Sequence, residues 1–169
     1  MKCLMELDSP RFNLTWKEKM AYLGFKFAEQ SEDPRKCPVS HTFTDTHYIR
    51  TMFIPKETLF IGRPHLQGHR CELESGKILL ITEDSKTHME APAELWSKPG
   101  YMMCLYAKTD VIGRTYHPLS DLASLVMQNP MSCPIDALEA HIFGSVTELI
   151  ALGEQVRRKI HAIEGKVAA

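Results

Sequence analysis

Short apolar runs separated by proline and glycine fill the middle of the chain, between positions 47 and 117. The runs are rich in Ile, Phe, Thr, Leu and Tyr, a composition typical of strands buried on one face. No helical pattern lies between them, so we expect antiparallel strands in a sandwich or barrel rather than a parallel α/β sheet. The predicted strands are 47–54, 58–61, 71–74, 77–82, 93–97, 102–107 and 111–116.

The first part of the chain has a helical pattern instead. We predict a helix at 16–30, with Asn13 or Thr15 as its cap. The residues that share one face of this helix are Trp16, Met20, Leu23 and Phe27. Positions 31–38 are polar and contain two prolines, which indicates a linker.

The pattern becomes helical again after Pro118. We predict a short helix at 119–127, a break at Asn129-Pro130, and then a seam of apolar residues spaced by threes, fours and sevens. The seam consists of Ile135, Leu138, Ile142, Leu149, Leu152, Val156 and Ile163. Such a seam packs either on the chain's own barrel or on a second copy, and Gly144 and Gly153 lie within it. We expect self-association into a homo-oligomer, because terminal amphipathic helices often pack against their own copies.

These patterns divide the 169 residues into three segments. We expect an N-terminal helical segment and linker at 1–38, a β-barrel at 39–118, and a C-terminal helical segment at 119–169. The length suits one domain with appendages rather than two full domains.

Charge and cysteine content narrow the function classes. Lys and Arg total 20 and Asp and Glu total 21, so the net charge of -1 predicts neither a nucleic acid nor an anionic membrane as partner. No apolar run approaches the ~18 residues of a membrane helix, and the N-terminus does not resemble a signal peptide. The five cysteines are scattered without a C-x-x-C pair, which argues against a disulfide framework. We therefore expect a cytoplasmic protein.

Two histidines four residues apart are the most suggestive candidates for chemistry. His65 and His69 lie among the turn-forming residues Gly62, Pro64 and Gly68. A straight strand would separate the histidines by roughly 13 Å, too far for two ligands that each lie about 2 Å from one metal ion. For a metal site the chain must bend between them, and Gly68 is the residue expected to allow the bend. The alternative is a pair of surface residues at a hairpin, and the spacing alone leaves both interpretations open.

The residues around this pair resemble the two conserved motifs of the cupin superfamily. The matching residues are Pro55-Lys56-Glu57, Gly62, His65, His69, Gly76, Ala91-Pro92-Ala93 and Lys98-Pro99-Gly100. The chain is most similar to the small single-domain cupin-like proteins of bacteriophages and bacteria. The resemblance implies a mainly β fold, an antiparallel jelly-roll barrel with α-helices flanking it at both ends of the chain.

The chain departs from the cupin pattern at the usual metal ligands. His65 takes the place of the second histidine of the first motif, and His69 takes the place of its glutamate. Arg63 stands where the first histidine is expected, and Met103 stands where the histidine of the second motif is expected. The resemblance therefore implies two ligands, and a third must come from elsewhere.

Inward-facing strand positions could supply the third ligand, because alternate residues of a barrel strand point inward. In order of preference the candidates are His117, His47 and Glu72. Imidazole ligands suit a divalent transition metal, and the cofactor we expect is Zn, Fe, Mn, Ni or Cu.

A small anionic ligand is the expected partner of this metal. Arg63 lies on the same predicted inward face, and its planar guanidinium suits a carboxylate or phosphate, unless it pairs with Glu57 or Glu72. Tyr48 and Arg50 alternate on the first predicted strand and complete the expected ligand-binding residues.

Two functions of different classes follow. The first is a cupin-like protein that binds a divalent transition metal through barrel histidines and a small molecule in the lumen; as an enzyme it would be a metal-dependent dioxygenase or isomerase. The second is a non-catalytic cupin scaffold that acts as a structural, assembly or partner-binding module. For a phage-encoded protein, either function would take place in the host cytoplasm.

Overall fold

The computed structural model describes residue 7 and residues 9–30, 37–122 and 135–167. The chain divides into two compact units, one formed by residues 35–144 and the other by residues 1–34 together with 145–169. The first unit contains all the described strands, and the second contains the two longest helices.

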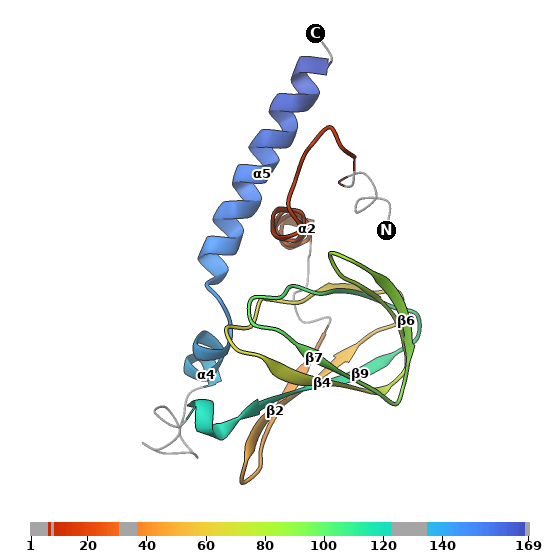
Figure 1. The fold of residues 1–169 in the computed structure, drawn as a ribbon, viewed down its shortest axis with the longest axis vertical. Coiled ribbons are helices and arrows are strands. Elements are labelled where there is room, and N and C mark those ends of the chain that lie inside the picture. Colours follow the sequence, from red (N-terminus) through yellow and green to blue (C-terminus); the bar gives the residue numbers. More distant parts are fainter. Residues whose placement is uncertain (1–6, 8, 31–36, 123–134, 168–169) are drawn as a thin grey trace. The chain divides into compact units, whose positions relative to one another are not determined.

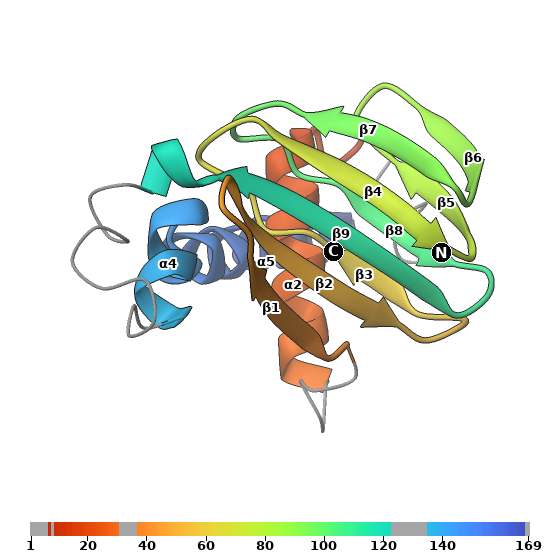
Figure 2. The same ribbon diagram turned by 90° about the horizontal axis from the view of Figure 1, so that it is seen from below.

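Among the described residues of the first unit, nine antiparallel strands form two sheets (Figure 1). One sheet has the order β1-β2-β9-β4-β7, visible side by side in Figure 2, and the other has the order β3-β8-β5-β6. The strands are β1 (Val39–Phe43), β2 (His47–Ile54), β3 (Leu59–Ile61), β4 (His69–Ser75), β5 (Lys77–Ile81), β6 (Lys86–Glu90), β7 (Ala93–Ser97), β8 (Cys104–Ala107) and β9 (Val111–Pro118).

This architecture confirms the predicted fold class, an antiparallel jelly roll with helices on both sides of it in the chain. Each of the seven predicted strands corresponds to an observed one, and β2 and β7 have the predicted bounds. The sequence pattern does not predict β1 or β6. The two sheets are separate hydrogen-bonded ladders, so the jelly roll is not a closed barrel.

The interior of the jelly roll changes character along its length. Ile54, Leu73 and Val111 point inward at one end and pack with Ile78 and Ala107 into an apolar core cluster. At the other end of the same strands, the inward positions carry tyrosine and histidine. Because successive strand residues alternate between faces, the apolar end fixes which residues of β2, β4 and β9 point inward at the polar end.

A short helix, α4 (Ile135–Ile142), packs at the polar end of the jelly roll (Figures 1 and 2). Its Leu138 and Ile142 are buried with Tyr48 of β2 and with Phe143, which follows the helix. The predicted helix at 119–127 begins as a 3-10 turn, η2 (Leu119–Leu122). Positions 123–127 and the predicted break at Asn129-Pro130 lie outside the described residues, as does most of the predicted linker.

The second unit pairs α2 (Trp16–Gln30) with α5 (Val146–Val167). The prediction of a helix at 16–30 is confirmed, and Thr15 is its cap. The Thr15 hydroxyl accepts a hydrogen bond from the Glu18 amide at 3.2 Å, and the Glu18 carboxylate accepts one from the Thr15 amide at 2.8 Å. This reciprocal pair satisfies two amides that the helix leaves without partners.

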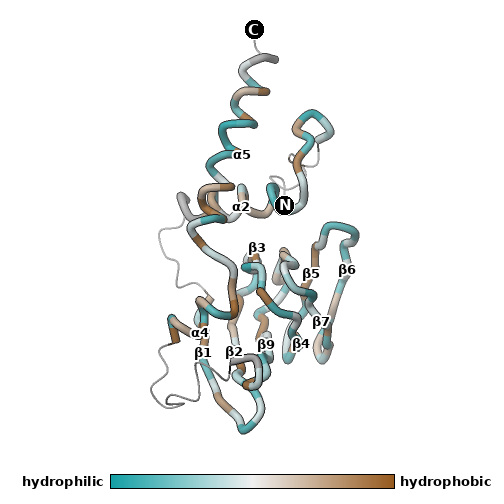
Figure 3. Tube along the Cα trace, turned by 60° about the vertical axis from the view of Figure 1, so that its left-hand side comes forward, coloured by the Kyte–Doolittle hydropathy of each residue, from teal (hydrophilic) through white to brown (hydrophobic). Residues whose placement is uncertain are grey.

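The predicted C-terminal seam is divided between the two units. Leu138 and Ile142 belong to α4 and are buried in the jelly-roll unit, whereas Val156 is buried in the α2–α5 unit. A Cβ on Gly153 would lie 2.6 Å from the Cβ of Phe25, so α5 approaches α2 closely at that glycine. Hydrophilic and hydrophobic stretches alternate along α5 (Figure 3). The predicted seam is therefore interrupted between α4 and α5, where Gly144 lies. Self-association through the C-terminal helix stays a prediction.

No helix in the described part of the chain is both long enough and apolar enough to cross a membrane.

Gly76 and Gly100 provide a matched test of the turns that position the strands. Both have a positive φ, 95° and 72°. A Cβ on Gly76 would lie 2.3 Å from the Asp110 carbonyl oxygen, whereas among the described residues nothing lies within 4 Å of a Cβ on Gly100. We expect Gly100→Ala to lower the free energy of unfolding by about 1 kcal/mol from backbone strain alone, and Gly76→Ala to lower it by about 2 kcal/mol more. Urea denaturation measures both, and equal losses would contradict the close approach at Gly76.

Candidate functional site

One row of inward side chains crosses the five-stranded sheet at its polar end. Tyr48 of β2 is the register partner of His117 on β9, and His69 of β4 is the partner of Ser97 on β7. Cys71 on β4 pairs with Thr115 on β9. His69 precedes Cys71 by two residues and His117 follows Thr115 by two, so the antiparallel register places His69 beside His117. The centres of these two rings are 5.1 Å apart.

The loop between β3 and β4 brings His65 to this row. The His65 carbonyl accepts a hydrogen bond from the Gly100 amide at 2.7 Å, and the Leu66 amide donates to the Ile142 carbonyl at 2.8 Å. The Gly144 amide donates to the Pro64 carbonyl at 3.0 Å. The loop is thus held on one side by the turn at Gly100 and on the other by the end of α4.

The bend between His65 and His69 that the sequence requires for a shared site is present. Their ring centres are 3.7 Å apart, and the His65 ring lies 5.3 Å from that of His117. The chain bends at Leu66 and Gln67. The prediction that Gly68 allows the bend is wrong, because Gly68 does not adopt a positive φ. A Cβ on Gly68 would lie 3.1 Å from the Trp96 indole nitrogen, so its lack of a side chain gives room to Trp96 instead.

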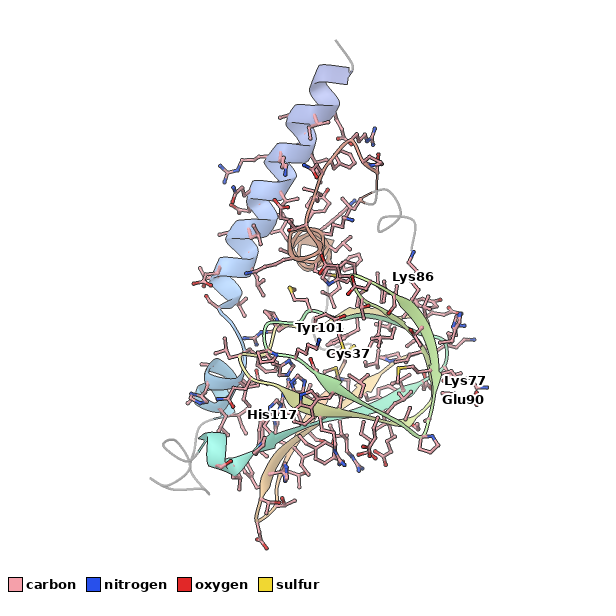
Figure 4. All side chains as sticks on the ribbon, in the orientation of Figure 1. Cys37, Lys77, Lys86, Glu90, Tyr101 and His117 are labelled. Atoms are coloured by element: carbon pink, nitrogen blue, oxygen red, sulfur yellow. The ribbon has the colours of Figure 1, made fainter. Side chains whose placement is uncertain are left out.

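Burial keeps the three imidazoles neutral. His65 is 8% exposed, His69 0% and His117 6%. His117 is labelled in Figure 4. Burial first, and then the neighbouring histidines, lower the pKa of His65 to about 2 and that of His117 to about 3. Burial also lowers the pKa of His69. Neutral imidazole is the form that binds a metal ion or accepts a proton.

In two of the imidazoles, one ring nitrogen has no hydrogen-bond partner among the described residues. His69 Nδ1 lies 3.4 Å from the Gln67 carbonyl oxygen, which a ring N–H can donate to. The Nε2 atoms of His65 and His69 are buried and have no hydrogen-bond partner among the described residues. His117 differs, because its Nε2 lies 3.2 Å from the Thr115 hydroxyl.

Two arginines line the same end of the interior. Arg50 of β2 donates to Glu139 of α4 at 2.9 Å, and Arg63 lies 3.8 Å from the other oxygen of that carboxylate. Both guanidinium groups lie over the Phe143 ring, at 4.7 and 4.4 Å from its centre. The Phe143 ring also contacts the His65 ring at 4.5 Å. The arginines and the histidines are therefore joined through one aromatic side chain.

The expected ligand-binding residue Tyr48 lies at the same end, fully buried. Its hydroxyl is 2.6 Å from His41 Nδ1, and burial raises its pKa to about 12. Tyr48 therefore stays protonated, and its ring packs against His117 with centres 6.0 Å apart.

Other expected site residues lie elsewhere. His47 precedes the inward Tyr48 and so faces outward, where its ring contacts Tyr116. Glu72 also faces outward and accepts a hydrogen bond from the Tyr116 hydroxyl. His47 and Glu72 were therefore wrong as candidate third ligands.

The partners considered for Arg63 were also wrong. Glu57 pairs with Lys56 at 3.7 Å and Glu72 pairs with Arg70 at 3.8 Å. The carboxylate beside Arg63 belongs to Glu139, which the sequence pattern does not single out. Met103, which replaces the second-motif histidine, contributes its carbonyl to a 2.8 Å hydrogen bond from the Gly62 amide.

The donor chemistry fits a transition metal better than the ring spacing does. Two imidazoles bound to one ion at about 2 Å place their ring centres roughly 5 Å apart. The spacings from His117 to His65 and to His69 match this value, but the 3.7 Å between His65 and His69 is shorter. Across residues 7, 9–30, 37–122 and 135–167, no group of three or more His, Cys, Asp or Glu side chains is arranged to hold a metal ion.

Comparison with known proteins yields similarity of structure but not of sequence. No family model matches the chain, and no curated protein matches it in sequence. Similar solved structures include a cupin superfamily protein from Desulfitobacterium hafniense, with 8% identity and a TM-score of 0.43, over 52% of this chain and 82% of that one. A protein from Klebsiella pneumoniae with a double-stranded β-helix domain has 14% identity and a TM-score of 0.43, over 51% of this chain and 79% of that one.

A third similar structure is a variant of salicylate 1,2-dioxygenase from Pseudoaminobacter salicylatoxidans in complex with gentisate. It has 11% identity and a TM-score of 0.45, and the match covers 61% of this chain and 32% of that one. This chain thus spans about a third of the dioxygenase.

The neutral histidines predict a steep loss of stability in acid for the metal-free protein. The pKa values of His65, His69 and His117 are lowered on folding, so below pH ~6.5 the unfolded chain binds more protons than the folded one. Stability is therefore greatest above that pH and falls as the pH drops. Between its folded and unfolded pKa values, each histidine contributes a slope of up to about 1.4 kcal/mol per pH unit.

We expect His117→Gln to reduce this slope by one histidine's share, as measured by urea denaturation at a series of pH values. His88→Gln, on the exposed strand β6, is the matched control and should leave the slope as it is. A slope unchanged by His117→Gln would contradict a buried, neutral His117.

Proposed function

We propose that the polar end of the jelly roll binds a small anionic molecule beside a divalent transition-metal ion. The observation that supports this most is a concentration of unsatisfied polar atoms. Five buried side-chain atoms of the described residues have no hydrogen-bond partner, and all belong to this end: Arg50 Nε, Arg63 Nε, His65 Nε2, His69 Nε2 and Ser97 Oγ. Buried polar groups without partners are rare in folded proteins and call for an explanation, such as a bound ion or a catalytic role.

The charges at this end favour an anion. Arg50 and Arg63 carry two positive charges, and Glu139 balances only one of them. The three histidines add no charge, because burial keeps them neutral. A small anion would therefore complete the charge balance, and guanidinium groups bind carboxylate and phosphate oxygens in pairs.

His65, His69 and His117 are the residues that would hold the metal, provided that the His65 and His69 rings move apart from their 3.7 Å spacing. The unpartnered Nε2 atoms of His65 and His69 support this assignment, and His117 would exchange its contact with Thr115 for the ion. Such an ion supplies Lewis acidity or activates oxygen. The chain's own residues orient the anion through Arg50 and Arg63, while Phe143 and α4 keep water from the imidazoles.

The scaffold function remains the second candidate, and one feature favours it. Leu138, Ile142 and Phe143 are buried with Tyr48 at the polar end, so the chain's own side chains occupy much of it. In that case the jelly roll would serve as a structural or partner-binding module, and the histidines would only pack.

Titration with Co²⁺ separates these two functions. We expect metal-free protein to bind about one equivalent of Co²⁺ with the visible absorption of a bound ion. His69→Ala should weaken the binding by about 100-fold or more, because removal even of a group that only supports a metal ligand typically costs 10–100-fold.

His88→Ala is the control for adventitious binding by surface histidines, because His88 is exposed on β6. It should bind Co²⁺ like the wild type. If the wild type binds no Co²⁺, or if both variants lose binding equally, the scaffold function is supported instead.

A further inference from the structure

Glu139 lies where an anionic ligand of the two arginines would lie. Its Oε1 accepts a 2.9 Å hydrogen bond from Arg50, and its Oε2 is 3.8 Å from Arg63. The Arg50 side chain is 11% exposed and the Glu139 side chain 26% exposed, so the pair is largely withdrawn from water. The partners are 89 residues apart in the sequence.

The carboxylate of Glu139 satisfies the arginines only in part. Both Nε atoms are buried without a partner in the described chain, and the Arg63 contact is longer than a hydrogen bond. A carboxylate that engages a guanidinium fully accepts two parallel hydrogen bonds from it. Arg63 instead donates a long bond of 3.4 Å to the Gly144 carbonyl. The two guanidinium groups thus have more donors than this one side chain uses.

α4 and Phe143 cover the guanidinium donors of Arg50 and Arg63. The Phe143 ring lies against both guanidinium groups, and backbone hydrogen bonds from Leu66 to Ile142 and from Gly144 to Pro64 fasten the end of the helix to the β3–β4 loop. Because the Nε atoms are buried while the helix is in place, a ligand that reaches them must displace part of what covers them.

We infer that the ligand of this site is a small carboxylate, and that Glu139 is an internal competitor that holds the ligand's place until the ligand displaces it. This inference rests on the anion-binding part of the proposed function and does not require the metal ion. A phosphate fits the geometry less well, because the group already held between the arginines is a planar carboxylate. The ligand gains the Nε donors that Glu139 leaves unused, and this difference drives the exchange.

Chemical rescue tests the inference. In Glu139→Ala the two arginines face each other without a counter-charge, so we expect a lower melting temperature that added acetate or benzoate restores. The same variant should bind acetate about tenfold or more tightly than the wild type does, because the competitor has been removed. Chloride and phosphate at matched ionic strength should restore much less. Thermal melts and calorimetric titration measure both effects.

Two further variants keep the test decisive. Glu139→Gln retains an amide that can accept from Arg50 but carries no charge, so it should fold and also bind acetate more tightly than the wild type. Glu94→Ala removes the partner of Arg70 on the outer face, where the two lie 3.4 Å apart and Glu94 is 59% exposed. It should show neither rescue nor tighter acetate binding.

Three results would overturn the inference: acetate binding by the Glu139 variants no tighter than that of the wild type, equal rescue by chloride, or equal rescue of Glu94→Ala. The Co²⁺ titration of the wild type tests the metal separately. A negative result with acetate would therefore contradict the carboxylate ligand, and a negative result with Co²⁺ would contradict the metal ion.

Discussion

The pleat of the five-stranded sheet is the constraint on which the polar end depends. Tyr48, His117, His69 and Ser97 lie in one row because alternate residues of β2, β9, β4 and β7 face the same way. The same alternation places Ile54, Leu73 and Val111 in the apolar core cluster at the other end. A shift of register by one residue would exchange the faces of a whole strand, so burial of the apolar end holds the histidines inward.

Segments distant in the sequence complete the site around this row. The β3–β4 loop adds His65 and Arg63, and α4 with the residue after it adds Glu139 and Phe143. Buried polar atoms without partners each cost about 1–3 kcal/mol, so five of them at one end are an expensive arrangement for stability alone. Unfavourable polar burial of this kind is typical of binding and catalytic sites, whose geometry is supported by a well-packed core elsewhere.

The sequence predicts the parts of the fold that rest on local patterns. Alternation and strand-forming residues locate β2 and β7 at their observed bounds, and helical periodicity locates α2. The sequence does not predict β6 because four of its five residues are exposed and the strand lacks an apolar face. β1 is a short edge strand in which three of the five residues are exposed and none is buried. The division between α4 and α5 follows from the tertiary packing of Leu138 and Val156, which heptad spacing does not reveal.

Within the candidate site, the sequence alone predicts neither the strand register nor which residues distant in the chain pair with each other. His65, His69, His117, Arg50, Arg63 and Tyr48 all lie at the polar end, whereas His47 lies on the outer face because it is one position out of phase with Tyr48. Glu139 and Phe143 could not be found from the sequence, since nothing local links them to arginines on a distant strand and loop.

Long-range ¹H–¹⁵N correlation spectra of the imidazole rings test the central claim most directly. At pH ~5, where an exposed histidine is charged, we predict neutral rings for His65 and His117, with Nε2 unprotonated in His65. Addition of Zn²⁺ should then shift the Nε2 signals of these rings. Rings that are charged at this pH, or Nε2 signals that Zn²⁺ leaves unchanged, would contradict a buried binding site at the polar end.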